Sequence, residues 1–317
     1  MVRSNVAIAL GLIFFCFILN AGAPCAVAES ESRYFHSGDG KLNLVSPKNG
    51  STFKGSYRAS DGTYNQDALK AIQRVFGAPY GQPISTISLR LVELLDFLQD
   101  RLQPDAQIAI ISGWRSPKYN TMLRNKGRLA AKASLHQYGM AADIKMDRVP
   151  SAHVWNYVKQ LGFGGAGYYH GELVHVDVGP ARSWDEKTSG VGTDISENNK
   201  LIGLTTDFDI YRADDVVTLR FIRMTAFPIG VMTEFALNRV EKDGSPKWIT
   251  DFKPKFARPT DGKCPEFEDI GEMLGIHYQL PKGIPAGRYR ISAFFCNRLW
   301  EEMPVEISTP EFQVVGP

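Results

Sequence analysis

The chain has 317 residues, and at roughly 150 residues per domain this length predicts about two domains. Hydrophobic residues make up 44% of the chain and charged residues 22%, which is typical of a packed globular protein and excludes a disordered chain. The formal net charge is only +2, so the sequence lacks the basic excess that binding to a phosphate backbone requires. We therefore expect no nucleic-acid partner.

The first 28 residues have the pattern of a secretory signal peptide. Arg3 precedes an apolar run over residues 6–19, and the small residues that follow end in Ala-Val-Ala at Ala28. The run is shorter than the roughly 20 residues that span a bilayer, so an uncleaved membrane anchor is the weaker alternative. Lipid attachment at Cys25 is disfavoured by Pro24 directly before it. The sequence predicts export across the inner membrane to the periplasm or the cell wall, with no membrane span after cleavage.

Two cysteines, Cys264 and Cys296, remain after the predicted cleavage. An even pair of cysteines in an exported protein predicts a disulfide. Neither cysteine lies near a histidine pair at metal-binding spacing, so we expect no thiolate metal site.

Four segments follow the signal peptide. Residues 29–65 have little periodicity and predict an irregular N-terminal arm, whereas the composition of residues 185–200 is typical of a linker. Between them, residues 66–184 form the first predicted domain. Its periodicity and its turn residues predict helices over 86–103, 116–124 and 150–161 and strands over 107–112, 167–169 and 173–178.

The last segment, residues 201–317, has a different pattern. Apolar residues alternate with polar ones, as at Val217, Leu219 and Phe221, and the same alternation recurs around Val231–Leu237 and Tyr289–Ala293. This pattern predicts an antiparallel β-sandwich of immunoglobulin or fibronectin type. The expected fold class is α+β, with a small antiparallel sheet and helices in the first domain and an all-β second domain.

Three of the six histidines lie close together in the first predicted domain, at His136, His170 and His175. His136 precedes Asp143 by seven residues, and small residues between them let the backbone turn so that both side chains reach one ion. His175 and Asp177 share one face of a predicted strand whose valines form the other face. His136, Asp143 and His175 would leave a fourth tetrahedral position open, as in catalytic zinc sites. Glu172 or Asp177 could supply the base that such a site needs.

These residues resemble the zinc D-Ala-D-Ala carboxypeptidases and related murein endopeptidases, whose metal site is similar to that of lysostaphin-type enzymes and of the hedgehog signalling domain. The resemblance covers roughly residues 70–185 and rests on three motifs, at 112–117 (SGWRSP), 134–143 (SLHQYGMAAD) and 174–177 (VHVD). It implies that His136, Asp143 and His175 bind zinc. It also implies that Arg115 points at the substrate, either to stabilise an oxyanion or to hold a carboxylate.

Two acids compete for the role of the base. Better-known members of the resembled family place the acid three residues before the last histidine, as Glu172 is placed here, whereas strand parity puts Asp177 on the metal face. Both assignments stay open at this point. Ser134, Tyr168 and Tyr169 are predicted to contact substrate, and His170 is not expected to be a fourth ligand because the open position would then be lost. Trp114, Trp155 and Trp184 are expected to be core or cover residues.

The sequence therefore predicts an exported zinc-dependent peptidase that hydrolyses amide bonds in peptidoglycan stem peptides or cross-links, as a carboxypeptidase or an endopeptidase. Peptidoglycan peptides are the expected partner and Zn²⁺ the expected cofactor, both implied by the resemblance. Two alternatives differ in class. In one, the chain is a zinc-stabilised wall-binding module without activity; in the other, the sandwich is the functional part and the first domain is a scaffold.

Overall fold

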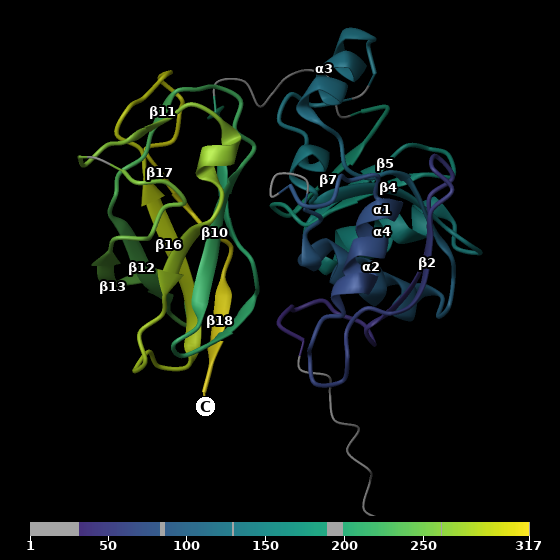
Figure 1. The fold of residues 1–317 in the computed structure, drawn as a ribbon, viewed down its shortest axis with the longest axis horizontal. Helices are drawn as coiled ribbons and strands as arrows, with labels where there is room; N and C mark the ends of the chain where they lie inside the picture. The colour runs from purple at the N-terminus through teal and green to yellow at the C-terminus, as the bar shows by residue number, and fades with distance from the viewer. Residues whose placement is uncertain (1–31, 83–85, 129, 189–198, 261, 317) are drawn as a thin grey trace, which may run out of the picture.

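The computed structural model describes residues 32–82, 86–128, 130–188, 199–260 and 262–316. The chain forms two lobes side by side, an N-terminal lobe of helices and strands up to residue 188 and a β-rich C-terminal lobe from residue 199 (Figure 1). The predicted signal peptide and most of the predicted linker lie outside the described residues. Within the described part, no helix is long and apolar enough to cross a bilayer.

A seven-stranded mixed sheet forms the centre of the N-terminal lobe. Across the sheet the order is β2 (Thr52–Ser56), β1 (Lys41–Val45), β3 (Ile108–Ser112), β4 (Ala141–Met146), β6 (Val174–Asp177), β5 (Gly165–Tyr168) and β7 (Arg182–Asp185). The β1–β3 and β5–β7 pairs are parallel, and the other neighbours are antiparallel. The prediction of a small antiparallel sheet is therefore wrong in both size and orientation.

Part of this difference comes from the N-terminal arm predicted over residues 29–65. That segment supplies β1 and β2, which pair as a hairpin and extend the sheet at one edge. The apolar face of β1 consists of only two buried residues, Leu42 and Leu44, so the alternation is too short to stand out in the sequence. The expectation of an irregular arm is wrong for these strands.

Four helices accompany the sheet: α1 (Gln66–Val75), α2 (Leu89–Leu102), α3 (Pro117–Asn125) and α4 (Ser151–Leu161). The last three match the predicted helices, and α1 was not predicted. The Ser116 hydroxyl accepts a hydrogen bond from the Tyr119 N–H and so caps α3. Gly162, in a left-handed conformation with φ of +63°, ends α4. The strands predicted at 107–112, 167–169 and 173–178 correspond to β3, β5 and β6.

The C-terminal lobe is built from three sheets. The first sheet contains β15 (Ile276–Gln279), β10 (Val216–Ile222) and β8 (Gly203–Thr206). The second contains, in order, β13 (Pro246–Phe252), β12 (Phe235–Val240), β16 (Gly287–Phe294), β18 (Phe312–Val315) and β9 (Ile210–Arg212), and β17 (Glu306–Ser308) also pairs with β16. The third contains β11 (Ile229–Gly230) and β14 (Glu266–Phe267). A short 3₁₀ turn, η4 (Ile270–Met273), precedes β15. The prediction of a β-rich region after the peptidase-like region is confirmed.

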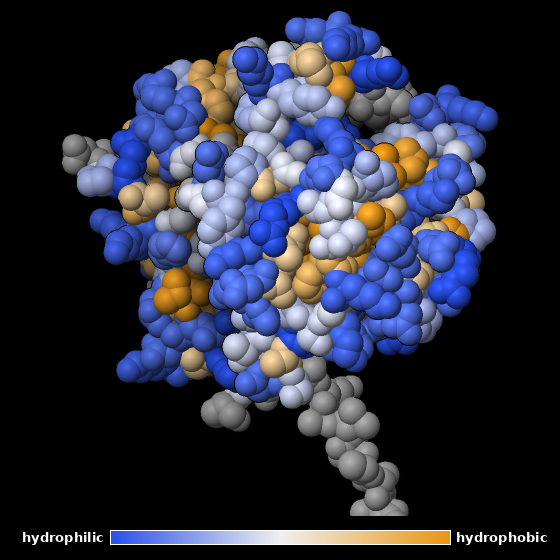
Figure 2. Space-filling view, turned by 45° about the vertical axis from the view of Figure 1, so that its right-hand side comes forward, coloured by the Kyte–Doolittle hydropathy of each residue, from blue (hydrophilic) through white to orange (hydrophobic). Residues whose placement is uncertain are grey.

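Each lobe has its own cluster of buried apolar residues. In the N-terminal lobe four leucines of α2 are fully buried: Leu91, Leu94, Leu95 and Leu98. In the C-terminal lobe the alternating residues of β10 and β16 point inward. The run predicted around 231–237 is divided, because β11 ends at Gly230 and β12 begins at Phe235. Hydrophilic side chains cover most of the face in Figure 2, where apolar side chains form separate patches.

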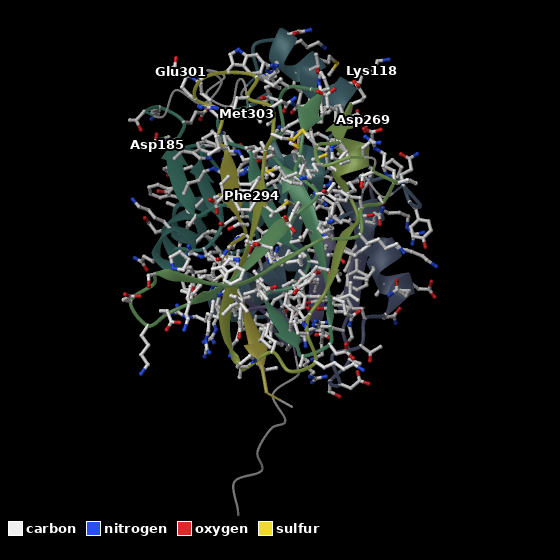
Figure 3. The ribbon with its side chains drawn as sticks, turned by 90° about the vertical axis from the view of Figure 1, so that its left-hand side faces the viewer. Lys118, Asp185, Asp269, Phe294, Glu301 and Met303 are labelled. Carbon is white, nitrogen blue, oxygen red and sulfur yellow. A yellow bond between two sulfur atoms is a disulfide. The ribbon has the colours of Figure 1, made fainter. Side chains whose placement is uncertain are left out.

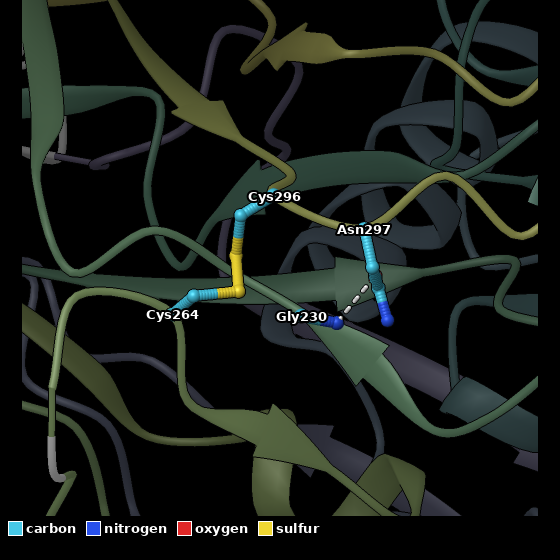
Figure 4. Close-up of a disulfide and its surroundings, with 4 residues drawn as sticks. All are labelled: Gly230, Cys264, Cys296 and Asn297. Atoms are coloured by element: carbon cyan, nitrogen blue, oxygen red, sulfur yellow. Dashed lines mark hydrogen bonds between the residues drawn. A yellow bond between two sulfur atoms is a disulfide. The ribbon is translucent and has the colours of Figure 1, made fainter.

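The predicted disulfide between Cys264 and Cys296 is present, with the two Cα atoms 6.0 Å apart (Figure 4). Beside it, the Gly230 N–H donates to the Asn297 Oδ1 over 2.7 Å, so β11 is tied to the chain that follows Cys296. That chain continues to Glu301 and Met303, which lie at the same end of the molecule as Lys118 of α3 (Figure 3).

Candidate metal centre

Three side chains of the N-terminal lobe converge at its central strands. His136, Asp143 and His175 each offer one donor atom, and the three atoms lie within 4.8 Å of one another. The Asp143 Oδ1 is 3.0 Å from the His175 Nδ1 and 3.5 Å from the His136 Nε2. All three side chains are buried, so they form a polar group inside the lobe.

The local sequence explains how the three residues meet. Asp143 of β4 and His175 of β6 are direct partners across the antiparallel pair. His136 lies in a 3₁₀ turn, η2 (Leu135–Tyr138), which ends at Gly139 with φ of +64°. A Cβ at residue 139 would approach the Thr86 carbonyl oxygen to 2.4 Å, so only glycine fits. The predicted turn is therefore correct for Gly139, whereas the alanines that follow belong to β4.

The hydrogen bonds of the two imidazoles set which nitrogen faces Asp143. The His136 Nδ1 is 2.8 Å from the Gly113 carbonyl oxygen, which can only accept, so Nδ1 carries the hydrogen and Nε2 is left with its lone pair. The His175 Nε2 is 2.9 Å from the Asp177 Oδ2, so Nδ1 of this ring faces Asp143. Metal-ligating histidines typically have their second nitrogen held by a carbonyl or a carboxylate in this way.

This donor set fits a zinc ion. Zinc bonds of about 2.0–2.2 Å in tetrahedral geometry separate neighbouring ligand atoms by roughly 3.3–3.5 Å. The two separations from the Asp143 Oδ1, 3.0 and 3.5 Å, lie close to this range. Two imidazole nitrogens and one carboxylate oxygen are ligands that zinc accepts readily. The three residues could therefore hold a zinc ion and leave one position open.

The electrostatics of the group favour a cation. Burial alone would raise the pKa of Asp143, but His136 and His175 hold it well below its usual value. Burial lowers the pKa of His136 and keeps its ring neutral. Burial also opposes a charge on His175, yet its hydrogen bonds to Asp143 and Asp177 outweigh that effect and raise its pKa. A bound metal ion would displace the proton that His175 otherwise shares with Asp143.

The carboxylate of Asp177 is saturated by hydrogen bonds. Its Oδ2 contacts the His175 Nε2 at 2.9 Å and the Arg182 Nη2 at 2.6 Å. Its Oδ1 accepts from the Gly179 N–H at 2.9 Å and from the Arg182 Nη1 at 3.0 Å. The side chain is fully buried, and burial, which raises its pKa, is outweighed by Arg182 and His175, so the pKa lies below its usual value. The predicted shared face with His175 is observed, and both oxygens of the carboxylate are already engaged in hydrogen bonds.

Glu172 lies in a different environment. Its side chain is 76% exposed, and its Oε1 accepts from the Lys145 Nζ at 2.8 Å. Lys145 is two residues after Asp143 on β4, so both project from the same face of the sheet. The structure thus places the Glu172 carboxylate at the exposed border of the face that carries Asp143 and His175.

Arg115 and Tyr169 both contact Asp143. The Arg115 Nη2 donates to the Asp143 Oδ2 at 2.8 Å, and its Nε donates to the Ser112 hydroxyl at 3.0 Å. The Tyr169 hydroxyl donates to the Asp143 Oδ1 at 3.0 Å. Burial, together with the charge of Asp143, raises the pKa of Tyr169, so its hydroxyl stays protonated and able to donate. Arg115 is buried and holds Asp143, and the contact with substrate that the resemblance implied stays a prediction.

The remaining predicted residues surround the group. Ser134 is buried at the start of η2, without a side-chain hydrogen bond to cap that turn. Tyr168 is half-buried and stacks on Trp155, with ring centroids 5.3 Å apart. Trp184 is half-buried and covers the edge of the group, 5.7 Å from the His175 ring and 5.2 Å from the Tyr169 ring. His170 pairs with Asp185 at 2.7 Å and is not part of the group.

Sequence reasoning missed two groups that hold the histidines. Arg182, at the start of β7, fixes Asp177 and through it His175. The Gly113 carbonyl fixes His136, and a backbone oxygen carries no signature in a sequence. The close approach of Gly113 to Phe76, where a Cβ would lie 2.5 Å from a carbonyl oxygen, requires glycine in the 112–117 motif.

Comparisons with known proteins match the region of the chain that contains this site. Residues 37–184 match the family Peptidase_M15_2, described as peptidoglycan L,D-endopeptidase MepK. MepK of Escherichia coli strain K12 and MepK of Shigella flexneri are each 31% identical over 144 residues, which are 45% of this chain and 79% of each relative. The probable MepK of Haemophilus influenzae is 41% identical over 81 residues, 25% of this chain and 44% of the relative. The chain belongs to the peptidoglycan L,D-endopeptidase MepK family, within the murein endopeptidases that its motifs resemble.

Proposed function

We propose that the chain is an exported zinc-dependent endopeptidase that hydrolyses an L,D amide bond in peptidoglycan peptides. The observation that carries this proposal is the convergence of His136, Asp143 and His175 inside the region that matches the MepK family. The names of the relatives favour endopeptidase over carboxypeptidase action. Export rests on the signal-peptide pattern of residues 1–28 and points to the periplasm or the cell wall.

A zinc ion at this site would act as a Lewis acid toward the amide carbonyl and would make water more acidic. His136, Asp143 and His175 would hold the ion, and their partners would fix each ligand. Gly113 orients His136, Asp177 orients His175, and Arg115 with Tyr169 orients Asp143. In this proposal these partners serve to place the three donor atoms.

We assign the proton transfer to Glu172. A base must have a lone pair in reach of water, and the four hydrogen bonds of Asp177 leave its carboxylate engaged on both oxygens. The Glu172 carboxylate, by contrast, pairs with Lys145 and is open to solvent at the border of the metal face. It would take a proton from the attacking water and pass it to the leaving amine.

The substrate side of the site is proposed from the aromatic residues next to it. Tyr168 and Tyr169 follow one another at the end of β5, and Tyr169 already touches Asp143. A peptide bound over the end of β5 would contact the hydroxyl of Tyr169 and the stacked rings of Tyr168 and Trp155. Ser134 stays a predicted substrate contact. Arg115 contributes by holding Asp143, and direct contact between Arg115 and substrate stays a prediction.

For the domain organisation we propose a signal peptide over 1–28, a peptidase domain over 66–184, extended by the hairpin of the preceding arm, a linker over 185–200 and a C-terminal domain over 201–317. The sheets that enclose one apolar core in the C-terminal lobe support a sandwich of immunoglobulin or fibronectin type. Its ligand is not assigned.

The proposed function is tested by incubating purified peptidoglycan fragments with the mature chain and identifying the products by mass spectrometry. We expect cleavage of an L,D cross-link, loss of cleavage with a chelator and recovery on addition of Zn²⁺. His175→Ala serves as the inactive variant. Cleavage that continues unchanged in this variant or in the chelator would contradict the proposal, as would a zinc-loaded chain without hydrolytic products.

A further inference from the structure

The C-terminal lobe reaches the turn that carries His136. Arg220 of β10 donates from Nη2 to the backbone oxygen of Tyr138, two residues after His136. The N–H of Met224 donates to the Tyr138 hydroxyl at 2.9 Å. The Arg220 guanidinium carbon also lies 5.5 Å from the Tyr138 ring centroid, close enough for a cation–π contact. Tyr138, only 3% exposed, is therefore contacted at both its backbone and its side chain by residues of the C-terminal lobe.

These contacts are not explained by the packing of the C-terminal lobe itself. In the part of the chain that the structure describes, no carboxylate pairs with Arg220, and its Nε is buried without a hydrogen-bond partner. Burial lowers the pKa of its guanidinium to about 10. Arg220 is half-buried, and a cation withdrawn from water without a counter-ion weakens stability, so its presence at this point indicates a role other than holding the lobe together.

The surroundings keep the two lobes in a fixed relation. Ile222, two residues after Arg220, is 2% exposed and belongs to the apolar cluster of the N-terminal lobe. Arg90 of α2 is buried and bonds to Asp209 and to the Thr206 carbonyl oxygen, both at 2.9 Å. The Ser88 N–H, just before α2, donates to the Gly139 oxygen at 2.9 Å. The turn is thus held between α2 on one side and β10 on the other.

We propose that the C-terminal lobe is a positioning element of the metal centre, acting through Arg220 and Tyr138 on the turn that bears His136. The inference rests on the proposed zinc site and goes beyond the family match, which ends at residue 184, before Arg220. The backbone of the turn decides where the His136 Nε2 lies relative to Asp143. Release of Tyr138 would let the turn move and would weaken one of three ligands, as loss of other ligand-orienting groups does.

The test measures metal binding by the full mature chain, residues 29–317. The wild type is compared with three variants, Arg220→Ala, Arg220→Lys and Tyr138→Phe. The zinc dissociation constant is obtained by competition with a chromophoric chelator, and the Co²⁺-substituted protein reports ligand geometry through its visible absorption. The matched control is Arg290→Ala, because Arg290 of β16 also has a buried, unpartnered Nε but pairs with Glu311 away from the turn.

For Arg220→Ala we expect a zinc dissociation constant about 10- to 100-fold higher than in the wild type, together with an altered Co²⁺ spectrum. Arg220→Lys should recover part of both effects, and Arg290→Ala should leave both unchanged. Tyr138→Phe removes one oxygen only and should weaken zinc binding in the same direction, even if Arg220→Ala fails to fold.

Two outcomes overturn the inference, and they are distinguishable. If the wild type binds one zinc ion and Arg220→Ala and Tyr138→Phe bind it equally well with unchanged spectra, the positioning role is refuted and the proposed function stands. If the wild-type chain binds no zinc, the proposed function fails and the inference fails with it.

Discussion

Replacement of Asp177 by asparagine separates orientation of a ligand from proton transfer. The Asp177 carboxylate accepts from four donors, the Gly179 N–H, two Arg182 nitrogens and the His175 Nε2. In asparagine an NH₂ group replaces one of the two carboxylate oxygens. That NH₂ group would face N–H donors where the oxygen accepted their hydrogen bonds. It also leaves the Arg182 charge without its partner, and it permits the His175 ring to reverse its tautomer, which removes the lone pair at Nδ1.

The magnitudes follow from these contacts. Removal of one member of a buried ion pair costs about 3–5 kcal/mol, and the cost here should fall near the lower end because the Arg182 side chain keeps 30% exposure. Loss of the group that orients a ligating histidine lowers metal affinity about 10- to 100-fold. Glu172→Gln should behave differently, because Glu172 is 76% exposed and its pair with Lys145 contributes at most about 1 kcal/mol.

The assay combines urea unfolding, zinc affinity and peptide hydrolysis at saturating zinc. We expect Asp177→Asn to be less stable and to bind zinc weakly, with much of its turnover restored by added zinc. Glu172→Gln should keep its stability and its zinc while turnover falls by about 10²- to 10⁴-fold. Glu301→Gln, an exposed acid on the other lobe, is the control. The reasoning is refuted if Asp177→Asn loses turnover with unchanged stability and zinc affinity, or if Glu172→Gln retains full turnover.

Three further predictions concern the metal, the disulfide and pH. The mature chain should contain one zinc ion by elemental analysis, and a His136→Ala, His175→Ala double variant should contain none; unchanged stoichiometry would refute the site. Reduction of the Cys264–Cys296 disulfide, whose cysteines are 32 residues apart, should lower the free energy of unfolding by about 3–4 kcal/mol without changing zinc content. Two reactive thiols in the unfolded, unreduced chain would contradict it. Burial raises the pKa of Asp96 to about 7, above its value near 3.9 in an unfolded chain. The folded state therefore binds this proton more tightly, and its contribution of at most about 4 kcal/mol is lost as pH rises from about 4 to about 7. Asp96→Asn should lose less stability than the wild type between these pH values in urea unfolding, and an identical pH dependence would show that Asp96 does not titrate in this range.

The elements that could be predicted from the sequence are those whose periodicity is complete within one segment. The leucines of α2 recur at three- and four-residue intervals, and the alternating residues of β10 and β16 point into one core. The missed elements lack such a signal. β4 is nearly buried throughout, so its apolar residues show no alternation, and Ala141 and Ala142 suggested a turn instead. Its place as a central strand depends on pairing with β3 and β6, which a local pattern does not contain.

The candidate ligands could be predicted because motif spacing brings them into a recognisable order, but their supports could not. Arg182 reaches Asp177 from the strand at the far edge of the sheet, and the Gly113 carbonyl reaches His136 across 23 positions of the chain. Arg220 reaches Tyr138 from the other lobe, 82 positions away. Each of these contacts joins segments that only the tertiary fold brings together, so the residue spacing within a motif carries no information about them.

The two acids near His175 differ in hydrogen bonding and in exposure, and our proposal of Glu172 as the base rests on that difference. The alternation of side chains along the strand correctly placed Asp177 on the same face as His175. At that position Arg182 and the Gly179 N–H also donate hydrogen bonds to the Asp177 carboxylate. A carboxylate held by four donors and kept below its usual pKa is a poor proton acceptor, because protonation would break those hydrogen bonds. Glu172 precedes His175 by three residues, and its carboxylate is open to water. Nearness to the ligand therefore favours an orienting role, and access to solvent favours the base.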